Sequence, residues 1–178
     1  MRFITTELEG AWIVDPEPHE DNRGLFARTY CAREFRKRGL MDAFVQCNTS
    51  WNARSGTVRG LHYQVPPSCE VKLVRCTTGS LWDVIVDLRP ASPTYLRHVG
   101  VELTAKNRRA LYIPEMFAHG FQTLEDSTEV FYQMSEFYAP NLAAGLQYQD
   151  PKLGIKWPLA VTCISDKDKA WPLLNFVR

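Results

Sequence analysis

Residues 71–88 read VKLVRCTTGSLWDVIVDL, two apolar-rich alternating runs joined by a Thr78-Gly79 turn signal. Alternation with a period of two, rich in β-branched residues, is typical of strands that bury one face. The two faces of the first predicted strand carry Lys72, Val74 and Cys76 on one side and Val71, Leu73 and Arg75 on the other. A lysine between apolar neighbours indicates either the edge of the interior or a polar site.

Further strands are predicted along the chain, and helices are few. The run 129–138 is rich in β-branched and aromatic residues, and turn signals recur at Arg89-Pro90, Ser92-Pro93, Asn107, Pro114 and Ala139-Pro140-Asn141. One short helix is expected over Ala32 to Arg38, ended by Gly39. Many short strands with few helices favour an all-β fold, a jelly-roll β-sandwich or barrel whose mouth can hold a ligand.

Length and composition are those of one ordinary globular domain. The chain has 178 residues, 45% hydrophobic and 23% charged, which is enough for one full core and argues against disorder. No internal repeat, low-complexity tract or linker interrupts it. We therefore expect a single domain over residues 1–178.

Charge and cysteine content exclude several classes of protein. A formal net charge of +1 provides no field for nucleic acid or an anionic membrane, so any phosphate must be bound by a few converging side chains. The apolar runs are too short to span a bilayer, and the N-terminus does not resemble a signal peptide. Five cysteines without a Cys-x-x-Cys pair disfavour a disulfide framework or a zinc ribbon. A reduced, cytoplasmic location is expected.

The segment GTVRGLHYQ at residues 56–64 carries an arginine and a histidine beside two glycines. On a strand, these glycines indicate close backbone packing next to a polar site. Taken alone, a single histidine on a strand is more often structural than catalytic. The chain continues with Lys72 and then with DVIVDLR (83–89), SPT (92–94), IPEMFAHGF (113–121), TEVFY (128–132), DP (150–151), IKWP (155–158) and SDKD (165–168).

In this order, the segments resemble the dTDP-4-dehydrorhamnose 3,5-epimerase family over about residues 21–172. The resemblance implies a cupin-type jelly roll, a homodimer whose N-terminal region packs on the partner, and no cofactor or metal. It also implies an enzyme of dTDP-rhamnose biosynthesis. The expected reaction converts dTDP-4-dehydro-6-deoxy-D-glucose to dTDP-4-dehydro-L-rhamnose by deprotonation and reprotonation at C3 and C5.

The chemistry of such a reaction requires three kinds of group. A ketone at C4 acidifies the hydrogens on C3 and C5, so an epimerase needs a base, an acid on the opposite face and positive charge near the enolate oxygen. By resemblance, His62 is the base, Asp168 orients it, Lys72 stabilises the enolate and Tyr132 returns the proton. Without the family, Asp168 would be interpreted as a solvated charge, Lys72 as a snorkelling lysine and Tyr132 as an interior aromatic.

The same resemblance assigns residues to substrate binding. A diphosphate calls for cationic donors, and the planar fork of arginine suits phosphate oxygens. The contacts expected from the resemblance are Arg23, Gln46, Asn48, Arg59, His119, Tyr138 and Lys167. Arg28, which departs from the family, is expected to contact the substrate as well. From the residues alone, Arg23 could equally be a turn residue before Gly24, and His119 a buried histidine before Gly120.

The sequence departs from the family mainly at the nucleotide end. Arg28 and Ala143 stand where typical members place substrate-contacting glutamates, and Glu70 stands where glutamine is common. The loop at residues 48–56 is one residue longer than usual. The reacting centre follows the family, whereas the identity of the base does not follow from the sequence.

Three other interpretations remain open. A metal-dependent cupin would need two histidines one residue apart, but the corresponding stretch is His62-Tyr63-Gln64. An inactive sugar-nucleotide-binding module would be expected to lose one of the four catalytic candidates, and all four are present. A mono-epimerase acting at C3 or C5 only, or an epimerase of a CDP- or GDP-linked sugar, would share the same constellation.

Overall fold

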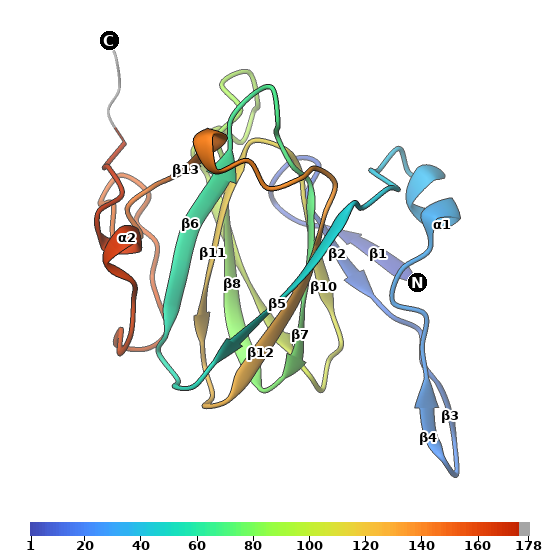
Figure 1. The fold of residues 1–178 in the computed structure, drawn as a ribbon. Coiled ribbons are helices and arrows are strands. Elements are labelled where there is room, and N and C mark those ends of the chain that lie inside the picture. Colours follow the sequence, from blue (N-terminus) through green and yellow to red (C-terminus); the bar gives the residue numbers. More distant parts are fainter. Residues whose placement is uncertain (175–178) are drawn as a thin grey trace.

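The computed structural model describes residues 1–174, so residues 175–178 of the predicted domain lie outside the described part of the chain. Two antiparallel sheets face each other as a β-sandwich (Figure 1). One sheet has the order β1 (Arg2–Thr5), β2 (Trp12–Asp15), β10 (Ala110–Ile113), β7 (Lys72–Thr78), β12 (Thr128–Met134), β5 (Gln46–Asn52). The other has the order β13 (Ala143–Gly145), β6 (Val58–Gln64), β11 (Phe117–Thr123), β8 (Ser80–Asp87), β9 (His98–Thr104). The predicted all-β fold is confirmed.

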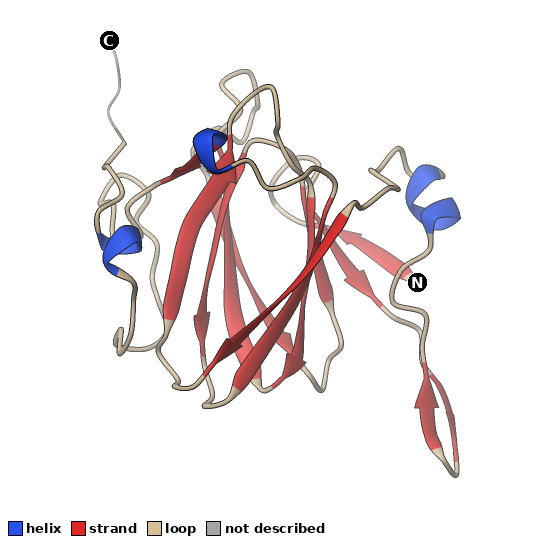
Figure 2. Cartoon of the chain, viewed as in Figure 1, coloured by secondary structure: helices blue, strands red, loops and turns tan. Residues whose placement is uncertain are grey.

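Helices are short and peripheral, as Figure 2 shows. In residues 1–174 they comprise α1 (Ala32–Arg36), the 3₁₀ turn η1 (Pro140–Leu142) and α2 (Asp166–Lys169). The prediction of a helix at Ala32 is confirmed, although α1 ends two residues earlier than expected. Gly39 follows with φ +69°, a left-handed conformation that favours glycine. The longest described helix has five residues, so none of the described helices can cross a bilayer.

The alternating stretch that predicted the fold forms β7 and β8. Val74 and Cys76 enter the core between the sheets, whereas Leu73, on the opposite face, packs in a second cluster with Phe35 of α1. The Thr78-Gly79 turn is also confirmed, because Gly79 joins the strands at φ +74° and a Cβ there would collide with Thr128. Both faces of β7 are therefore apolar, and Lys72 lies where the strand begins.

The predicted strand over 129–138 is shorter than expected. β12 ends at Met134, and the Ser135 hydroxyl accepts the backbone N–H of Val71 at 2.8 Å. Beyond it, Phe137 and Tyr138 are largely exposed, at 61% and 51%. Aromatic residues raised the strand propensity of this segment, but they form part of a surface instead.

A two-stranded hairpin, β3 (His19–Asp21) and β4 (Gly24–Phe26), projects from the sandwich near the N-terminal strands (Figure 1). All six of its strand residues are exposed, including Phe26 at 72%. The hairpin pairs with neither large sheet. Leu25, beside Phe26 in β4, is 39% exposed, so the arm carries two adjacent exposed apolar side chains.

Candidate active site

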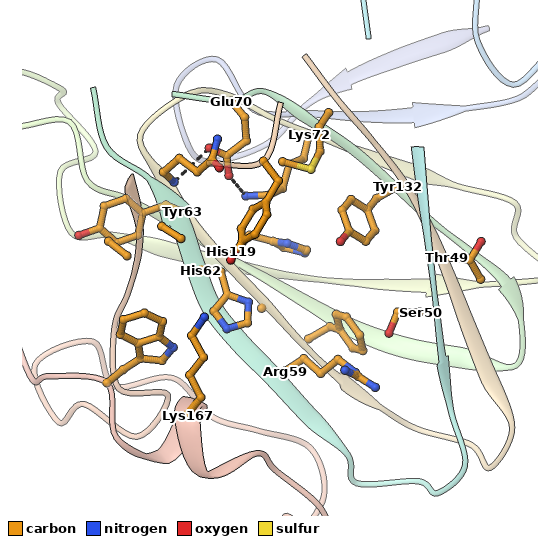
Figure 3. Close-up of a pocket in the computed structure, with 18 of the residues that line it drawn as sticks. Thr49, Ser50, Arg59, His62, Tyr63, Glu70, Lys72, His119, Tyr132 and Lys167 are labelled. Carbon is orange, nitrogen blue, oxygen red and sulfur yellow. Dashed lines mark hydrogen bonds and ion pairs between the residues drawn. The ribbon is translucent and has the colours of Figure 1, made fainter. Parts of the chain in front are cut away.

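A cavity of about 480 Å³ opens between the two sheets. Seven of the twelve predicted site residues line it: Arg59, His62, Lys72, His119, Tyr132, Tyr138 and Lys167. Figure 3 shows His62 and Tyr132 projecting into it from different strands. Because β6 and β12 belong to facing sheets, these two side chains lie on opposite walls.

The register of the paired strands explains which side chains share each wall of the cavity. On one sheet, His62 of β6 lies directly opposite His119 of β11. On the other, Tyr132 pairs with Val74 and Met134 pairs with Lys72, which makes Tyr132 and Lys72 diagonal neighbours on one face. The two histidines thus face the lysine and the tyrosine across the cavity.

A bulge brings Arg59 and His62 to the same wall. Residues three apart on a regular strand point to opposite faces, but the β6–β11 register shifts between them. Gly60 lies in this bulge at φ +132°, and a Cβ there would come within 2.5 Å of the Gly120 Cα atom. The prediction of close backbone packing from the glycines of this segment is confirmed.

His62 is held by a carboxylate from the C-terminal segment. Its Nε2 atom lies 2.7 Å from Asp168 Oδ1. The Gly60 amide donates to Asp168 Oδ2 at 3.3 Å, and the Trp171 indole N–H donates to Oδ1 at 3.3 Å. An ionised carboxylate only accepts hydrogen bonds, so it fixes the proton of neutral His62 on Nε2 and leaves Nδ1 as the basic nitrogen.

Asp168 remains ionised in this arrangement. Burial alone would raise its pKa, but the hydrogen bond and charge of His62, with the Gly60 and Trp171 bonds, lower the pKa below its ordinary value. Ser165 caps the short helix by accepting the Asp168 backbone N–H at 3.0 Å. The carboxylate can therefore stabilise a protonated imidazole.

Lys72 is buried on the opposite wall and forms an ion pair with Glu70. The second carboxylate oxygen of Glu70 accepts the backbone N–H of Gln64 at 3.0 Å. The ammonium is therefore presented beside the cavity with its counterion attached. A donor of this kind suits an oxygen that gains negative charge.

Tyr132 is partly buried against the core and lines the cavity. Burial raises the pKa of its phenol, and the nearby positive charge of Arg59 opposes this effect. The hydroxyl is therefore protonated at neutral pH and can donate a proton.

His119 forms a second histidine–carboxylate pair deeper in the sandwich. Its Nε2 atom lies 2.6 Å from Asp83 Oδ1, and both side chains are buried. Asp83 Oδ2 is buried without a hydrogen-bond partner among the described residues. The ring of His119 is thus oriented by a carboxylate, as that of His62 is.

Two positively charged side chains, Arg59 and Lys167, line the cavity on its solvent-exposed side. Arg59 donates from Nε to Asn52 Oδ1 at 2.7 Å, and Lys167 Nζ lies 5.4 Å from the centre of the Trp171 ring. The guanidinium and the ammonium both line the cavity, so an anionic ligand would meet positive charge there.

Gln46 and Asn48 belong to β5, an edge strand of its sheet, and Gln46 contacts the segment that carries Tyr138. Gln46 Oε1 accepts the Tyr138 backbone N–H at 2.5 Å, and Asn48 Nδ2 lies 3.5 Å from the Met134 sulfur. Tyr138 lines the cavity, whereas Gln46 and Asn48 support its wall without lining it. For these two residues, direct substrate contact stays a prediction.

Arg23 and Arg28 are not brought to the cavity within one chain. Arg23 lies on the projecting hairpin, bound to Asp21 at 2.5 Å, with its side chain 85% exposed. Arg28 lines a separate cavity of about 300 Å³ with the N-terminus and lies 3.8 Å from Glu34. Their contact with a substrate stays a prediction that would require a second chain.

Three neighbours of the predicted residues were not assigned a role from the sequence. Glu70 pairs with Lys72, Trp171 contacts both His62 and Asp168, and Gln64 joins Glu70 to the cavity wall. Glu70 precedes β7, which begins at Lys72, so the signal that could have found it is its closeness to Lys72 in the sequence rather than the two-residue period of a strand. The irregular C-terminal segment offers no such rule for Trp171.

Comparisons with known proteins identify the family to which this chain belongs. A family model described as dTDP-4-dehydrorhamnose 3,5-epimerase matches residues 5–175. The enzyme of that name from Methanothermobacter thermautotrophicus is 45% identical over 178 residues, covering 98% of this chain and 95% of the relative.

Solved structures agree with this assignment. A dTDP-4-dehydrorhamnose 3,5-epimerase from Bacillus anthracis, with TDP and PPi bound, superposes with a TM-score of 0.94 at 40% identity, covering 97% of this chain and 99% of its own. A dTDP-6-deoxy-D-glucose-3,5-epimerase from Legionella pneumophila, in complex with dTDP-4-keto-L-rhamnose, gives 0.92 at 37%, covering 99% and 94%. The chain therefore belongs to the dTDP-4-dehydrorhamnose 3,5-epimerase family and is an isomerase.

Proposed function

We propose that this single-domain chain converts dTDP-4-dehydro-6-deoxy-D-glucose to dTDP-4-dehydro-L-rhamnose, using its own side chains at C3 and C5. The observation that carries the proposal is the placement of the His62–Asp168 pair and Tyr132 on opposite walls of one cavity, with Lys72 beside Tyr132. Inversion of a carbon requires removal of a proton from one face and its return on the other.

The first step is deprotonation beside the ketone. Nδ1 of His62 takes the proton from C3 or C5, and the bonding electrons move onto the C4 oxygen as an enolate. Asp168 stabilises the imidazolium that forms, because its carboxylate is already bound to the other ring nitrogen. Lys72 donates to the enolate oxygen.

The second step is reprotonation from the opposite face. Tyr132 donates its phenolic proton to the carbon, the enolate collapses to the ketone, and the tyrosinate recovers a proton from solvent. The raised pKa of Tyr132 keeps this proton available at neutral pH. The proton on His62 is released to solvent in the same cycle, so the reaction consumes no co-reactant.

Substrate binding combines the cations at the open side with aromatic and polar side chains. Arg59 and Lys167 suit the diphosphate, His119 suits a polar group of the sugar, and Tyr138 suits the ring of the base or sugar. Gln46 and Asn48 are proposed to contact substrate from β5.

We further propose a homodimer, in which the β3–β4 hairpin packs on the partner. Its exposed Phe26 and its separation from both large sheets support this arrangement. Arg23 of one chain could then approach the cavity of the other. A cytoplasmic location is proposed as well, since all five cysteines are free thiols.

One experiment tests the reaction and its alternatives. The enzyme is incubated with dTDP-4-keto-6-deoxyglucose in deuterated water, and NMR identifies the carbons that take up deuterium. Label at both C3 and C5 supports the full reaction, and label at one carbon indicates a mono-epimerase. Label at neither carbon would contradict the proposal and favour another nucleotide sugar or a binding module.

A further inference from the structure

Glu70 uses both of its carboxylate oxygens beside the cavity. Oε1 accepts the Lys72 ammonium and Oε2 accepts the backbone N–H of Gln64, as the dashed lines in Figure 3 mark for this cluster. Glu70 is 5% exposed and Lys72 is 7% exposed. The pair is thus built into the wall rather than lying on the surface.

Burial makes the partner of Lys72 important. An ammonium that loses water without gaining a counterion is costly, and removal of one member of a buried pair leaves an uncompensated charge. A bound substrate would remove still more water from this site. Glu70 therefore provides the counterion of the Lys72 ammonium and holds it at the cavity wall, where positive charge is needed near an enolate.

Gln64, which is bound to Glu70, is also bound to the segment on either side of Tyr138. Its side chain, 2% exposed, donates to the Phe137 carbonyl at 3.3 Å and accepts the Ala139 N–H at 2.6 Å. These two residues flank Tyr138. The position of Glu70, and through it that of Lys72, is therefore tied to the segment that carries Tyr138.

We propose that Glu70 is a positioning residue for the epimerisation. It fixes the Lys72 ammonium at the cavity wall through their buried ion pair. The inference rests on the proposed role of Lys72. Glutamine at this position could accept the same hydrogen bond, but it carries no charge, so charge and position can be separated by mutation.

The first test compares Glu70→Met with Glu70→Gln, using deuterium exchange from the sugar for kcat and KM. Met removes both the acceptor and the charge, and kcat is expected to fall at least about 10-fold with KM within about 3-fold, because the enolate exists only after substrate binds. Gln keeps an acceptor, so its kcat should lie between those of Met and wild type. Asp15→Asn, which removes a buried carboxylate from an ion pair outside the cavity, should leave kcat unchanged.

The second test asks whether Glu70 acts through Lys72. In a Lys72→Met background, adding Glu70→Met should change kcat less than about 2-fold, since residues that act as a unit are not additive. The ¹⁵N signal of Lys72 Nζ should move in Glu70→Met, because the ammonium loses its hydrogen-bond partner Glu70, and it should move less in Glu70→Gln.

Unchanged kcat and an unchanged Lys72 signal in Glu70→Gln and Glu70→Met would overturn the inference. An equal fall in kcat from Glu70→Met in the wild-type and in the Lys72→Met background would overturn it as well. If Glu70→Met does not fold, Glu70→Gln decides by the same measurements. If the wild-type enzyme exchanges no deuterium into the sugar, that result contradicts the proposed function and not this inference. The ¹⁵N signal of Lys72 in the Glu70 variants would still show whether Glu70 positions Lys72.

Discussion

Asp168 follows His62 by 106 residues, yet its Oδ1 atom lies 2.7 Å from His62 Nε2. The C-terminal segment reaches this position because it runs beside the start of β6, where the Val58 N–H donates to the Cys163 carbonyl at 2.8 Å. Ser165 then begins the short helix that carries Asp168. The proposed base and the carboxylate proposed to orient it therefore come from opposite halves of the chain, and folding of the C-terminal segment brings them together.

Removal of the proposed base should strongly reduce exchange without unfolding the protein. His62→Ala is expected to lower deuterium uptake roughly 10²–10⁴-fold, while calorimetry still detects binding of dTDP. Near-normal exchange in this variant would show that the base has been misassigned.

Asp168→Asn should reduce the rate while leaving His62 in place. An asparagine can donate to Nε2 and favour the wrong tautomer, so Nδ1 would carry the proton. We expect kcat to fall roughly 10²-fold or more, with Asp166→Asn as control, since Asp166 lies on the same helix with an exposed side chain. Equal rates in both variants would contradict the orienting role.

Tyr132→Phe should differ in kind from these variants. The base can still remove a proton, but no phenol is available to return one on the opposite face. NMR should detect deuterium at the first carbon while inversion of configuration fails. Normal inversion by Tyr132→Phe would exclude the tyrosine as the acid.

Activity should be independent of added metal. His62 and His119 each bind a carboxylate through Nε2, and no group of three His, Cys, Asp or Glu in residues 1–174 could hold a metal ion. Extensive chelation is expected to leave the exchange rate unchanged. Loss of activity that a divalent cation restores would contradict this prediction.

Asp87 should contribute to acid-sensitive stability. Burial alone would raise its pKa, but hydrogen bonds from Arg89, Ser92 and Thr94 lower the pKa to about 2. Because the folded-state value lies below the ordinary one, the stabilisation is present above about pH 4 and disappears as pH falls through about 2. The shift corresponds to about 2 kcal/mol.

Urea unfolding at several pH values checks this prediction. Asp87→Asn should lower the free energy of unfolding by about 2 kcal/mol at pH 7, with the difference shrinking toward pH 2. The exposed ion pair of Asp166 with Lys169 at 3.0 Å provides a control, since its loss should change stability by less than about 1 kcal/mol. A difference that persists at low pH would show that Asp87 acts by packing rather than by charge.

The sequence predicted strands well where both faces are buried. β7 and β8 appear where alternation placed them, because apolar residues recur on faces that the sandwich covers. It failed beyond Met134, where Phe137 and Tyr138 suggested more strand although they are exposed. Strand propensity measures how well a residue fits a half-buried surface. It therefore does not distinguish a strand from an irregular segment at the rim of a site.

Some site residues could be placed from the local strand pattern, whereas others are brought to the site only by the tertiary fold. Lys72 and Tyr132 could be given a face from the strand pattern, whereas Glu70 precedes β7 and the period of the strand does not place it. Asp168 could not be placed either, because an Asp-Lys-Asp-Lys run has the pattern of a solvated surface and only the tertiary fold brings it to His62. Its role was predicted from the family resemblance alone.

The last prediction concerns recognition of the nucleotide. The two residues that replace the substrate-contacting glutamates of the family, Arg28 and Ala143, lie in different places. Ala143 lines the cavity on β13, whereas Arg28 lies beside Glu34 in the N-terminal segment. In the proposed dimer, Arg28 would reach the site of the partner chain and donate to phosphate or to the carbonyl oxygens of thymine. A guanidinium cannot accept hydrogen bonds, so the contacts offered to the base differ from those of a glutamate. We expect dTDP to bind more tightly than UDP, CDP or GDP in calorimetric competition.

Arg28→Ala should weaken dTDP binding about 10-fold, or about 1.4 kcal/mol, whereas Arg33→Ala on the exposed face of α1 should leave it unchanged. If Arg28 contacts only phosphate, all four nucleotides should lose affinity equally, since a phosphate contact does not distinguish bases. If it contacts thymine, dTDP should lose more affinity than CDP or GDP, because a site built on hydrogen bonds discriminates when a partner is removed. A preference for dTDP that is unchanged in both strength and order in Arg28→Ala would show that this departure carries no specificity, and would leave Ala143 as the residue to test.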